Sequence, residues 1–334
     1  MDKFLIVDAS HLFYRARYAV RGTVDEKIGM ALHILFTSLS KSWRTQKTNH
    51  IVFAFDGHSW RKDEYKPYKA NRSAKRAKET PAQVAEGKLF FEAFDIFQDF
   101  IKTRTNCTVL EDSILEADDL IAGFIQSHPS DEHVIVSRDG DFEQLMASNV
   151  VIYNGIADTT TTMAGVFDYK GKPVIEKRTG LMKAAPNPEW SVFEKCMRGC
   201  SSDNIFSAYP GIREKGTKKK LGLEDAFEDR HKQGFDWSSV MHHHWTDPQG
   251  TEHKVFDDYQ RNKILVDLTA QPDRIKTAIF ETIDKSCVPL NRPQIGLYFL
   301  KFCGKYELVR LSDQANIFSQ LLSAAYPNHG RKTV

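Results

Sequence analysis

Several sequence features that mark common functional classes are missing from this chain. Its five cysteines form no CxxC pair and are odd in number, which argues against a zinc ribbon or a disulfide framework. A reducing compartment such as the cytoplasm fits this cysteine usage best. No apolar run approaches the length of a membrane span, and the run at residues 4–7 is broken by Asp8, too soon for a signal peptide.

Nucleotide-binding signatures are absent as well. No GxGxxG motif follows the first apolar run and no GxxxxGK[ST] motif occurs anywhere, so a dinucleotide-binding or P-loop protein is not favoured. The net charge is only +2 over 334 residues. The overall charge therefore predicts no partner, and local clusters of charge carry the information.

Short apolar runs that alternate with helical patterns organise the first half of the chain. Five of these runs are typical of buried strands: residues 4–8, 51–55, 107–110, 133–137 and 149–153. Helical patterns at about 28–43 and 81–103 lie between them, which predicts an α/β fold with a mostly parallel sheet and helices on both faces. Residues 154–188 are rich in turn residues and are expected to form irregular connections and a hairpin. Helices are expected at about 190–198, 259–268 and 272–283.

Acidic residues follow several of the predicted strands. They are Asp8, Asp56, Asp139 and Asp141 at strand ends, and Glu116, Asp118 and Asp119 at the start of a helix. Any one of them could cap a helix, and Ser113 with Glu116 fits a capping box. Because parallel strands end at one edge of a sheet, however, all seven are expected to meet there. Such a set is tolerable around hard divalent cations, Mg²⁺ or Mn²⁺, and two such ions can clamp the attacking and leaving oxygens of a phosphodiester.

A basic segment with interleaved aromatic residues lies at residues 60–78. Its eight basic residues and two acids give a net charge of +6. This pattern is typical of a groove for single-stranded nucleic acid, and the alternative is a solvated basic loop. The expected nucleic-acid contacts are Arg61, Lys62, Lys66, Tyr68 and Arg76.

Two further segments have less specific patterns. Residues 210–220 combine a glycine-marked turn with Lys215, Lys218 and Lys219, and are predicted to lead into a basic helix that grips duplex phosphates. The triplet His242-His243-His244 lies in a polar, Trp-bearing segment. A surface insertion is the favoured interpretation of that triplet, with a metal site as the alternative.

Six motifs occur in the order typical of one family. They are Val7-Asp8-Ala9-Ser10-His11-Leu12-Phe13-Tyr14-Arg15-Ala16, Phe55-Asp56, Tyr68-Lys69-Ala70-Asn71-Arg72, Glu116-Ala117-Asp118-Asp119, Asp139-Gly140-Asp141-Phe142-Glu143-Gln144-Leu145 and Gly199-Cys200-Ser201-Ser202-Asp203-Asn204-Ile205. On these motifs, over roughly residues 3–225, the chain resembles the 5′ nucleases. That group contains the flap endonucleases, the 5′ nuclease domain of bacterial DNA polymerase I, and the phage-type 5′–3′ exonucleases, including the phage RNase H.

The resemblance implies a PIN-like nuclease domain at residues 1–188, with a basic helical arch at about 57–80. It implies a helical DNA-binding region at 189–334, with a helix-hairpin-helix-like segment and an insertion at about 235–257. Asp8, Asp56 and Asp118 would serve a first Mg²⁺, with Glu116 contributing directly or through water. Asp139, Asp141 and Asp203 would serve a second, with Asp119 nearby or in the outer shell. Lys69 and Arg72 would contact the scissile phosphate, and Lys195 matches a second basic position that faces the site. Cys200 stands where many relatives carry a further Asp, and Gly211 and Gly216 are further apart than in the usual motif, which in relatives also holds K⁺.

The expected function is that of a metal-dependent 5′ nuclease, a flap endonuclease or 5′–3′ exonuclease. It would hydrolyse phosphodiesters at or near the 5′ ends of branched or duplex DNA in replication or repair. RNA–DNA hybrids are a second expected substrate, replication proteins are expected partners, and the chain is expected to be a monomer in the cytoplasm, the host cytoplasm if phage-encoded. The alternatives are a PIN-type ribonuclease that acts on free RNA, a non-catalytic nucleic-acid-binding protein, and a small-molecule phosphatase.

Overall fold

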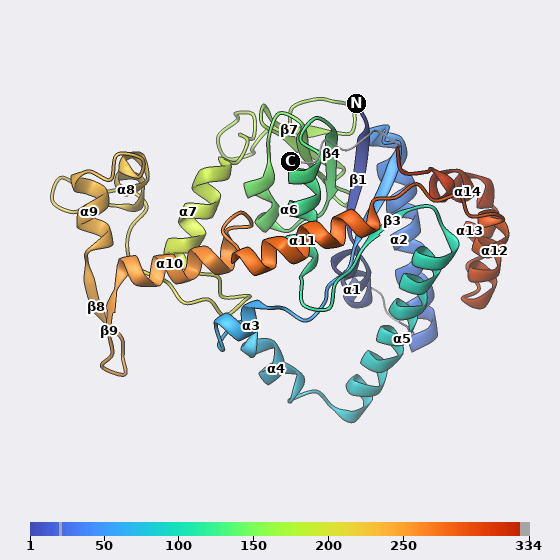
Figure 1. The fold of residues 1–334 in the computed structure, drawn as a ribbon, viewed down its shortest axis with the longest axis horizontal. Coiled ribbons are helices and arrows are strands. Elements are labelled where there is room, and N and C mark those ends of the chain that lie inside the picture. Colours follow the sequence, from blue (N-terminus) through green and yellow to red (C-terminus); the bar gives the residue numbers. More distant parts are fainter. Residues whose placement is uncertain (20–21, 328–334) are drawn as a thin grey trace. The chain divides into compact units, whose positions relative to one another are not determined.

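The structure is a computed structural model and describes residues 1–19 and 22–327 (Figure 1). The chain forms two compact units. Unit 1 consists of Met1–Ser59, Glu79–Ala185 and Arg274–Val334, and unit 2 consists of Trp60–Lys78 and Pro186–Asp273.

A seven-stranded sheet is the framework of unit 1. Its strand order is β3-β2-β1-β4-β5-β6-β7. The strands β1 (Lys3–Asp8), β2 (His50–Ala54), β3 (Thr108–Leu110), β4 (Glu132–Val136) and β5 (Val150–Asn154) are parallel. The last two strands, β6 (Thr159–Thr162) and β7 (Gly165–Asp168), form an antiparallel hairpin at one edge. The predicted mostly parallel α/β sheet is therefore confirmed.

Helices cover both faces of this sheet. Leu5 and Val7 of β1 face a core built with α1 (Ala9–Ala19), α2 (Val24–Gln46), α5 (Pro81–Arg104), α12 (Ile295–Lys305) and α14 (Ala315–Ser323). The other face is covered by α6 (Ala117–Ser127), beside which α11 (Asp273–Ser286) runs (Figure 1). A Cβ on Gly123 of α6 would lie 2.1 Å from Ile279 Cγ2 of α11, so glycine is what allows the two helices to approach.

Aromatic and histidine side chains close the edge of the sheet where the strands begin. Phe4 is buried and contacts the rings of His50, His128, His133 and Tyr326. His128 Nε2 lies 2.5 Å from the Tyr326 hydroxyl, and His50 Nδ1 lies 3.0 Å from the carbonyl oxygen of residue 324. The chain after α14 is thereby fixed to β1 and β2. Burial lowers the pKa of both His50 and His133 to about 4, so these rings are neutral at pH 7.

Unit 2 has an aromatic core of its own. The helices are α3 (Arg61–Glu64), α4 (Ala70–Arg76), α7 (Pro188–Arg198), α8 (Leu223–Asp229), α9 (Phe235–Met241) and α10 (Val255–Val266), and β8 (His244–Thr246) pairs with β9 (Glu252–Lys254) in a hairpin. Phe193 of α7 packs on Trp237 of α9 and Tyr259 of α10. Tyr68 joins the same core. This packing joins residues 60–78 to a segment that lies more than a hundred residues later.

The structure differs from the sequence-based expectations in three places. The division into consecutive domains at 1–188 and 189–334 differs from the compact units, because residues 60–78 pack with unit 2 and residues from 274 onward pack on the sheet of unit 1. Helices α12, α13 (Val309–Ser312) and α14 were not predicted. The basic helix predicted after residue 220 was wrong: α8 has the sequence LEDAFED, and the lysines lie in the turn before it.

None of the helices in residues 1–19 and 22–327 is both long enough and apolar enough to cross a bilayer.

Candidate functional site

The predicted acids of unit 1 follow the ends of its parallel strands. Asp8 is the last residue of β1, where it pairs in register with Ala54 of β2, and Val7 pairs with Val136 of β4. Asp56 therefore lies two residues beyond the end of β2, and Asp139 lies three beyond the end of β4. The backbone brings these three acids to one edge of the sheet. That all seven predicted acids share one metal site stays a prediction.

The loop after β3 folds back along the residues that follow β2. Phe55 N donates to the Leu110 carbonyl at 3.0 Å, and Gly57 N donates to the Leu115 carbonyl at 2.7 Å. Gly57 is required here, since a Cβ would lie 2.0 Å from the Asp112 carbonyl oxygen. Asp56 Oδ1 then accepts a hydrogen bond from Ala117 N at 2.9 Å, which places the Asp56 carboxylate at the start of α6.

The start of α6 carries the other three acids. Glu116 is the N-cap and is buried, Asp118 is half-buried, and Asp119 is fully buried. Asp119 Oδ2 accepts a hydrogen bond from Glu116 N at 3.3 Å. A capping box is therefore present, but Glu116 and Asp119 form it. It lies three residues later in the chain than the box expected at Ser113 and Glu116.

Asp139 and Asp141 lie on a tight turn that leads into a 3₁₀ helix, η1 (Gly140–Leu145). Asp139 Oδ1 accepts a hydrogen bond from Asp141 N at 3.1 Å, so Asp139 caps this helix. On β1, Asp8 Oδ1 accepts from His11 N at 3.0 Å, and His11 Nδ1 lies 3.8 Å from Asp8 Oδ2. His11 is a neighbour of the predicted acids that sequence reasoning did not single out.

The donor chemistry of this edge fits a hard divalent cation, because it consists of carboxylate oxygens. Backbone N–H groups nevertheless engage Asp56, Asp119 and Asp139 in the structure. Within residues 1–19 and 22–327, no group of three or more His, Cys, Asp or Glu side chains is arranged to hold a metal ion. Each of these bonds uses one carboxylate oxygen, so the other oxygen of each group keeps its capacity to accept a cation.

Unit 2 brings the arch residues against the loop that carries Asp203. Arg72 Nη2 lies 2.7 Å from Asp203 Oδ1, and Lys69 N donates to the Asp203 carbonyl at 2.8 Å. Asn71 Nδ2 donates to the Ser201 carbonyl at 3.0 Å, and Asn204 Nδ2 donates to the Pro67 carbonyl at 2.7 Å. Two predicted catalytic residues and one predicted metal ligand thus share a single network.

Sequence reasoning missed the two asparagines of this network. Asn204 has a φ of 56°, a left-handed conformation that asparagine adopts more readily than most residues. In the sequence, its position directly after Asp203 was the one feature that could have marked Asn204 as part of the site. Lys69 also has a positive φ, 53°, at the start of α4, and its ammonium lies 4.9 Å from the centre of the Tyr68 ring.

The loop that holds Asp203 is closed by backbone pairing. Cys200 N donates to the Ile205 carbonyl and Ile205 N to the Cys200 carbonyl, both at 2.9 Å. Cys200 Sγ lies 2.9 Å from Ser202 Oγ and 3.9 Å from Asp203 Oδ2. Lys195, on α7, is half-buried.

Two of the predicted nucleic-acid contacts need correction. Arg61 is buried, with 2% of its surface exposed, and its Nε donates to the Leu265 carbonyl at 2.8 Å. Tyr68 is 5% exposed and belongs to the core of unit 2. Both side chains hold the arch to unit 2 and are not available to stack on or contact a strand. The remaining basic residues are exposed or half-buried: Lys62, Lys66, Arg76, Lys215, Lys218 and Lys219.

The foot of the arch is also linked to the β8–β9 hairpin. His253 Nδ1 lies 2.9 Å from Asp258 Oδ2, and Asp258 forms an ion pair with Arg261. The Arg261 guanidinium lies 5.1 Å from the centre of the Tyr65 ring. Three side chains therefore connect the hairpin to the residues directly before Lys69.

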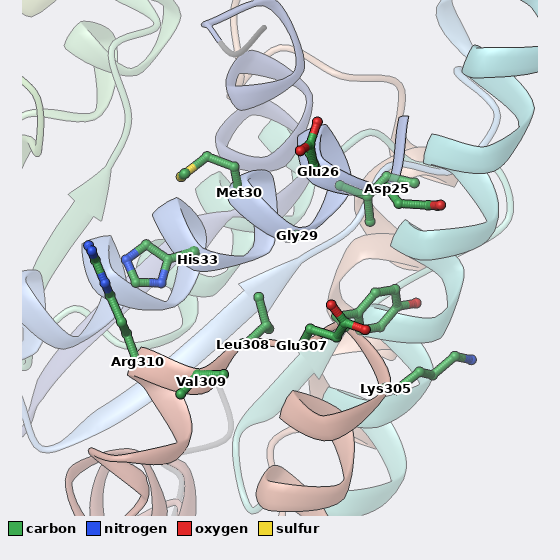
Figure 2. A pocket seen from close by; sticks show the side chains of 12 residues that line it. Asp25, Glu26, Gly29, Met30, His33, Lys305, Glu307, Leu308, Val309 and Arg310 are labelled. Atoms are coloured by element: carbon green, nitrogen blue, oxygen red, sulfur yellow. The ribbon is translucent and has the colours of Figure 1, made fainter. Parts of the chain in front are cut away.

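A cavity of about 870 Å³ in unit 1 is lined by none of the predicted site residues. It lies between the first half of α2 and the segment that joins α12 to α13, with His33 and Arg310 on one side (Figure 2). Burial and the Arg310 charge lower the pKa of His33. The cavity is therefore separate from the acids at the strand ends.

Known proteins match this chain in both sequence and fold. A 5′-3′ exonuclease of Mycoplasmopsis pulmonis is 27% identical over 236 residues, which cover 68% of this chain and 70% of that relative. A DNA polymerase I of Rhizobium leguminosarum is 26% identical over 242 residues, but the match covers only 21% of the polymerase. A flap endonuclease Xni of Shewanella putrefaciens is 32% identical over 150 residues, 43% of this chain and 51% of that relative.

Solved structures show the same fold at low identity. The T5 D15 protein co-crystallised with metal ions has a TM-score of 0.53 at 18% identity and covers 84% of this chain and 99% of its own. T5 5′-exonuclease with bound zinc has a TM-score of 0.58 at 18% identity, with 85% and 99% coverage. The family model for the 5′-3′ exonuclease N-terminal, resolvase-like domain matches residues 3–177. Because that match spans more than half of the 334 residues, this chain belongs to the 5′-3′ exonuclease family.

Proposed function

We propose that this chain is a divalent-metal-dependent 5′ nuclease that cleaves phosphodiesters at or near the 5′ ends of branched or duplex DNA. The observation that carries the proposal is the gathering of Asp8, Asp56 and Asp139 at one sheet edge, in a member of this exonuclease family. Carboxylates from three separate segments at one edge have no common structural task. They suit a reaction in which negative charge develops on phosphate oxygens beside bound cations.

We assign Asp8, Asp56, Glu116 and Asp118 to a first Mg²⁺, and Asp139, Asp141 and Asp203 to a second. Asp119, whose side chain accepts a hydrogen bond from Glu116 N, would act by orienting Glu116. When bound, the ions supply a nucleophile at neutral pH and stabilise charge on the phosphate. The protein contributes the positions of its carboxylates, which are set by strand ends, the Gly57 turn and the η1 turn. Mn²⁺ would replace Mg²⁺, since both prefer oxygen donors.

The arch would supply cations to the scissile phosphate. Lys69 and Arg72 are tied to the loop of Asp203 by backbone and side-chain bonds, which supports a joint role for arch and loop. Lys195 would add a third cation. Positive charge held at a reacting phosphate lowers the activation barrier, because its attraction to the phosphate oxygens is stronger in the transition state than in the ground state.

The test is a cleavage map on end-labelled substrates in Mg²⁺, with EDTA as the metal-free control. The substrates are a 5′ flap, a nicked duplex, a duplex with a blocked 5′ end, an RNA–DNA hybrid and single-stranded RNA. We expect products with a 5′-phosphate from the flap and nicked DNA in Mg²⁺ and in Mn²⁺, and none in EDTA. Cleavage of free RNA alone would favour the ribonuclease alternative, and cleavage in EDTA would contradict metal dependence. We also propose a K⁺ site at the helix-hairpin-helix-like segment, and duplex affinity measured in K⁺ and in Na⁺ tests it.

A further inference from the structure

Unit 2 contains a cavity of about 700 Å³ with a strongly cationic lining. Two segments form it. Residues 209–221 contribute Arg213, Lys215, Lys219 and Lys220, and the end of α9 with the following turn contributes Ser239, Val240 and His243. In the part of the chain that the structure describes, no aspartate or glutamate lines this cavity. The positive charges there repel one another unless an anion enters.

The α9 wall belongs to the insertion at residues 235–257 and is firmly held. Trp237, Val240 and Met241 are buried in the core of unit 2. Trp237 N donates to Asp229 Oδ2 at 3.0 Å, which fixes the start of α9 to the end of α8. Since three of its seven residues are anchored in this way, α9 presents Ser239 and His243 from a rigid support.

Direct contacts join the insertion to the basic segment. The His243 ring stacks on the Tyr209 ring at 4.6 Å with an angle of 20° between the planes. Trp245 Nε1, on β8, donates to the Ala208 carbonyl at 2.9 Å. Burial raises the pKa of Tyr209, so its hydroxyl stays protonated at pH 7 and can donate a hydrogen bond. The Tyr209 hydroxyl and the His243 ring therefore offer hydrogen-bonding groups beside the cations.

The lysines are set on a tight turn. Thr217 N donates to the Lys220 carbonyl at 2.7 Å, and Thr217 Oγ1 accepts from Lys220 N at 3.2 Å. Lys219 and Lys220 are exposed, while Lys215 has a weak partner in Glu224, whose carboxylate lies 3.9 Å from the Lys215 ammonium. The turn thus places the positive charges of Lys219 and Lys220 in the lining of the cavity without neutralising them.

We propose that the insertion is part of the nucleic-acid-binding surface, and that His243 and Tyr209 bind backbone phosphates of the duplex part of the substrate together with Lys219 and Lys220. The proposal rests on the proposed function, because it names a binding site for that substrate. Cations beside hydrogen-bonding side chains suit the phosphodiester backbone of nucleic acid. A free phosphate shares that chemistry, and the experiment separates the two sources.

The experiment measures the affinity of the full chain for a labelled blunt duplex in EDTA, as a function of salt. His243→Ala removes a donor, and we expect about 3- to 10-fold weaker binding, as for a lost hydrogen bond. His242→Ala is the matched control, because His242 is exposed and does not line the cavity. Lys220→Ala should lower the salt slope by about one, and Lys232→Ala, on the surface elsewhere in unit 2, should leave it unchanged.

The double variant His243→Ala/Lys220→Ala tests whether both residues contact the same phosphate. We expect its loss to be smaller than the product of the two single losses, because either variant alone already weakens the shared contact. Tyr209→Phe keeps the stacked ring and removes only the hydroxyl. Its effect on affinity therefore tests the proposal even if an alanine variant fails to fold. Thermal unfolding of each variant is measured alongside.

Wild-type duplex affinity in both His243→Ala and Tyr209→Phe would overturn the proposal. Inorganic phosphate that displaces the duplex at millimolar concentration, with loss of this competition in His243→Ala, would assign the cavity to a small anion and would also overturn it. These measurements use no divalent metal and no cleavage. Failure of the inference therefore leaves the nuclease proposal standing, whereas absence of metal-dependent cleavage by the wild-type chain contradicts the nuclease proposal itself.

Discussion

Arg72 and Asp203 form an ion pair in unit 2, with Nη2 and Oδ1 2.7 Å apart. The Asp203 side chain is 13% exposed and that of Arg72 is 52% exposed, so water screens the pair only in part. A cation from the arch thus neutralises a carboxylate that we assign to a metal. The guanidinium would have to leave Asp203 before it could contact a phosphate.

Removal of this competing charge should strengthen metal binding while it weakens catalysis. We expect Arg72→Ala to bind Mn²⁺ about 3- to 5-fold more tightly, as a partly exposed ion pair implies. Its turnover should nevertheless fall, because the cation that we assign to the scissile phosphate is gone. Calorimetric titration with Mn²⁺ and single-turnover cleavage measure the two effects, and Arg72→Lys should lie between. Unchanged Mn²⁺ affinity in both variants would show that the ion pair does not compete.

The acids at the strand ends should be needed for cleavage and not for binding. Asp118→Asn and Asp139→Asn are each expected to reduce turnover by about 1,000-fold or more, because they remove charge that would hold a cation. Duplex affinity in EDTA should stay near the wild-type value. Asp95→Asn, an exposed acid on α5, provides the comparison. Near-normal turnover of Asp118→Asn and Asp139→Asn would refute the assignment.

Lys69 should act on turnover far more than on duplex binding. Lys69→Ala removes the ammonium that lies over the Tyr68 ring, while the backbone bond to the Asp203 carbonyl can remain. We expect a loss of about 100-fold or more in turnover and less than about 5-fold in duplex affinity. Lys69→Met keeps the aliphatic contact with the ring and should behave like Lys69→Ala. Equal losses in turnover and affinity would make the arch a general electrostatic contact.

Two glycines near the acids differ in what surrounds them. Gly57→Ala should destabilise the protein by about 3 kcal/mol, since the added Cβ would meet the Asp112 carbonyl oxygen at 2.0 Å. Gly140→Ala should cost less than about 1 kcal/mol, because nothing lies within 4 Å of its Cβ position. Urea unfolding of the two variants gives the comparison. Equal free energies of unfolding would contradict the close approach of the loop after β3 to Gly57.

Stability should fall as the pH drops below about 6.5. His50 and His133 have pKa values near 4 when folded and about 6.5 when unfolded, so between these values the unfolded chain takes up protons that the folded chain does not. We expect each histidine to lower the free energy of unfolding by about 2 kcal/mol at pH 5 relative to pH 7.5. Urea unfolding at the two pH values measures this. Between pH 7.5 and pH 5, the free energy of unfolding of His133→Gln should fall by about 2 kcal/mol less than that of the wild type. The same pH dependence in both proteins would contradict neutral burial of the His133 ring.

The sequence predicted the parts of the fold that depend on local patterns. The five parallel strands were visible because apolar runs of four or five residues mark buried strands, and Asp8 and Asp56 could be assigned to one edge because parallel strands share a direction. The sequence could not show whether Ser113 and Glu116 or Glu116 and Asp119 form the capping box, because the residues of both pairs are three positions apart.

Features that depend on tertiary packing were not predictable in this way. Arg61 and Tyr68 look like exposed nucleic-acid contacts in a basic segment, and only the fold shows that they pack into unit 2. The attachment of the arch to residues 186–273 crosses more than a hundred residues of sequence, and no local pattern encodes a contact of that range. Asn71 and Asn204 were missed for the same reason, because their partners are backbone carbonyls on a distant loop.

The chain of contacts from His253 through Asp258 and Arg261 to Tyr65 limits how this enzyme could be shortened. Residues 244–254 protrude as a hairpin and would be an obvious segment to trim in protein engineering. Trimming them would remove one of the two partners of Asp258 and leave Arg261 as the other. A miniaturised version would therefore need a replacement hydrogen-bond partner for Asp258, and random truncation libraries should be depleted of variants that lack one.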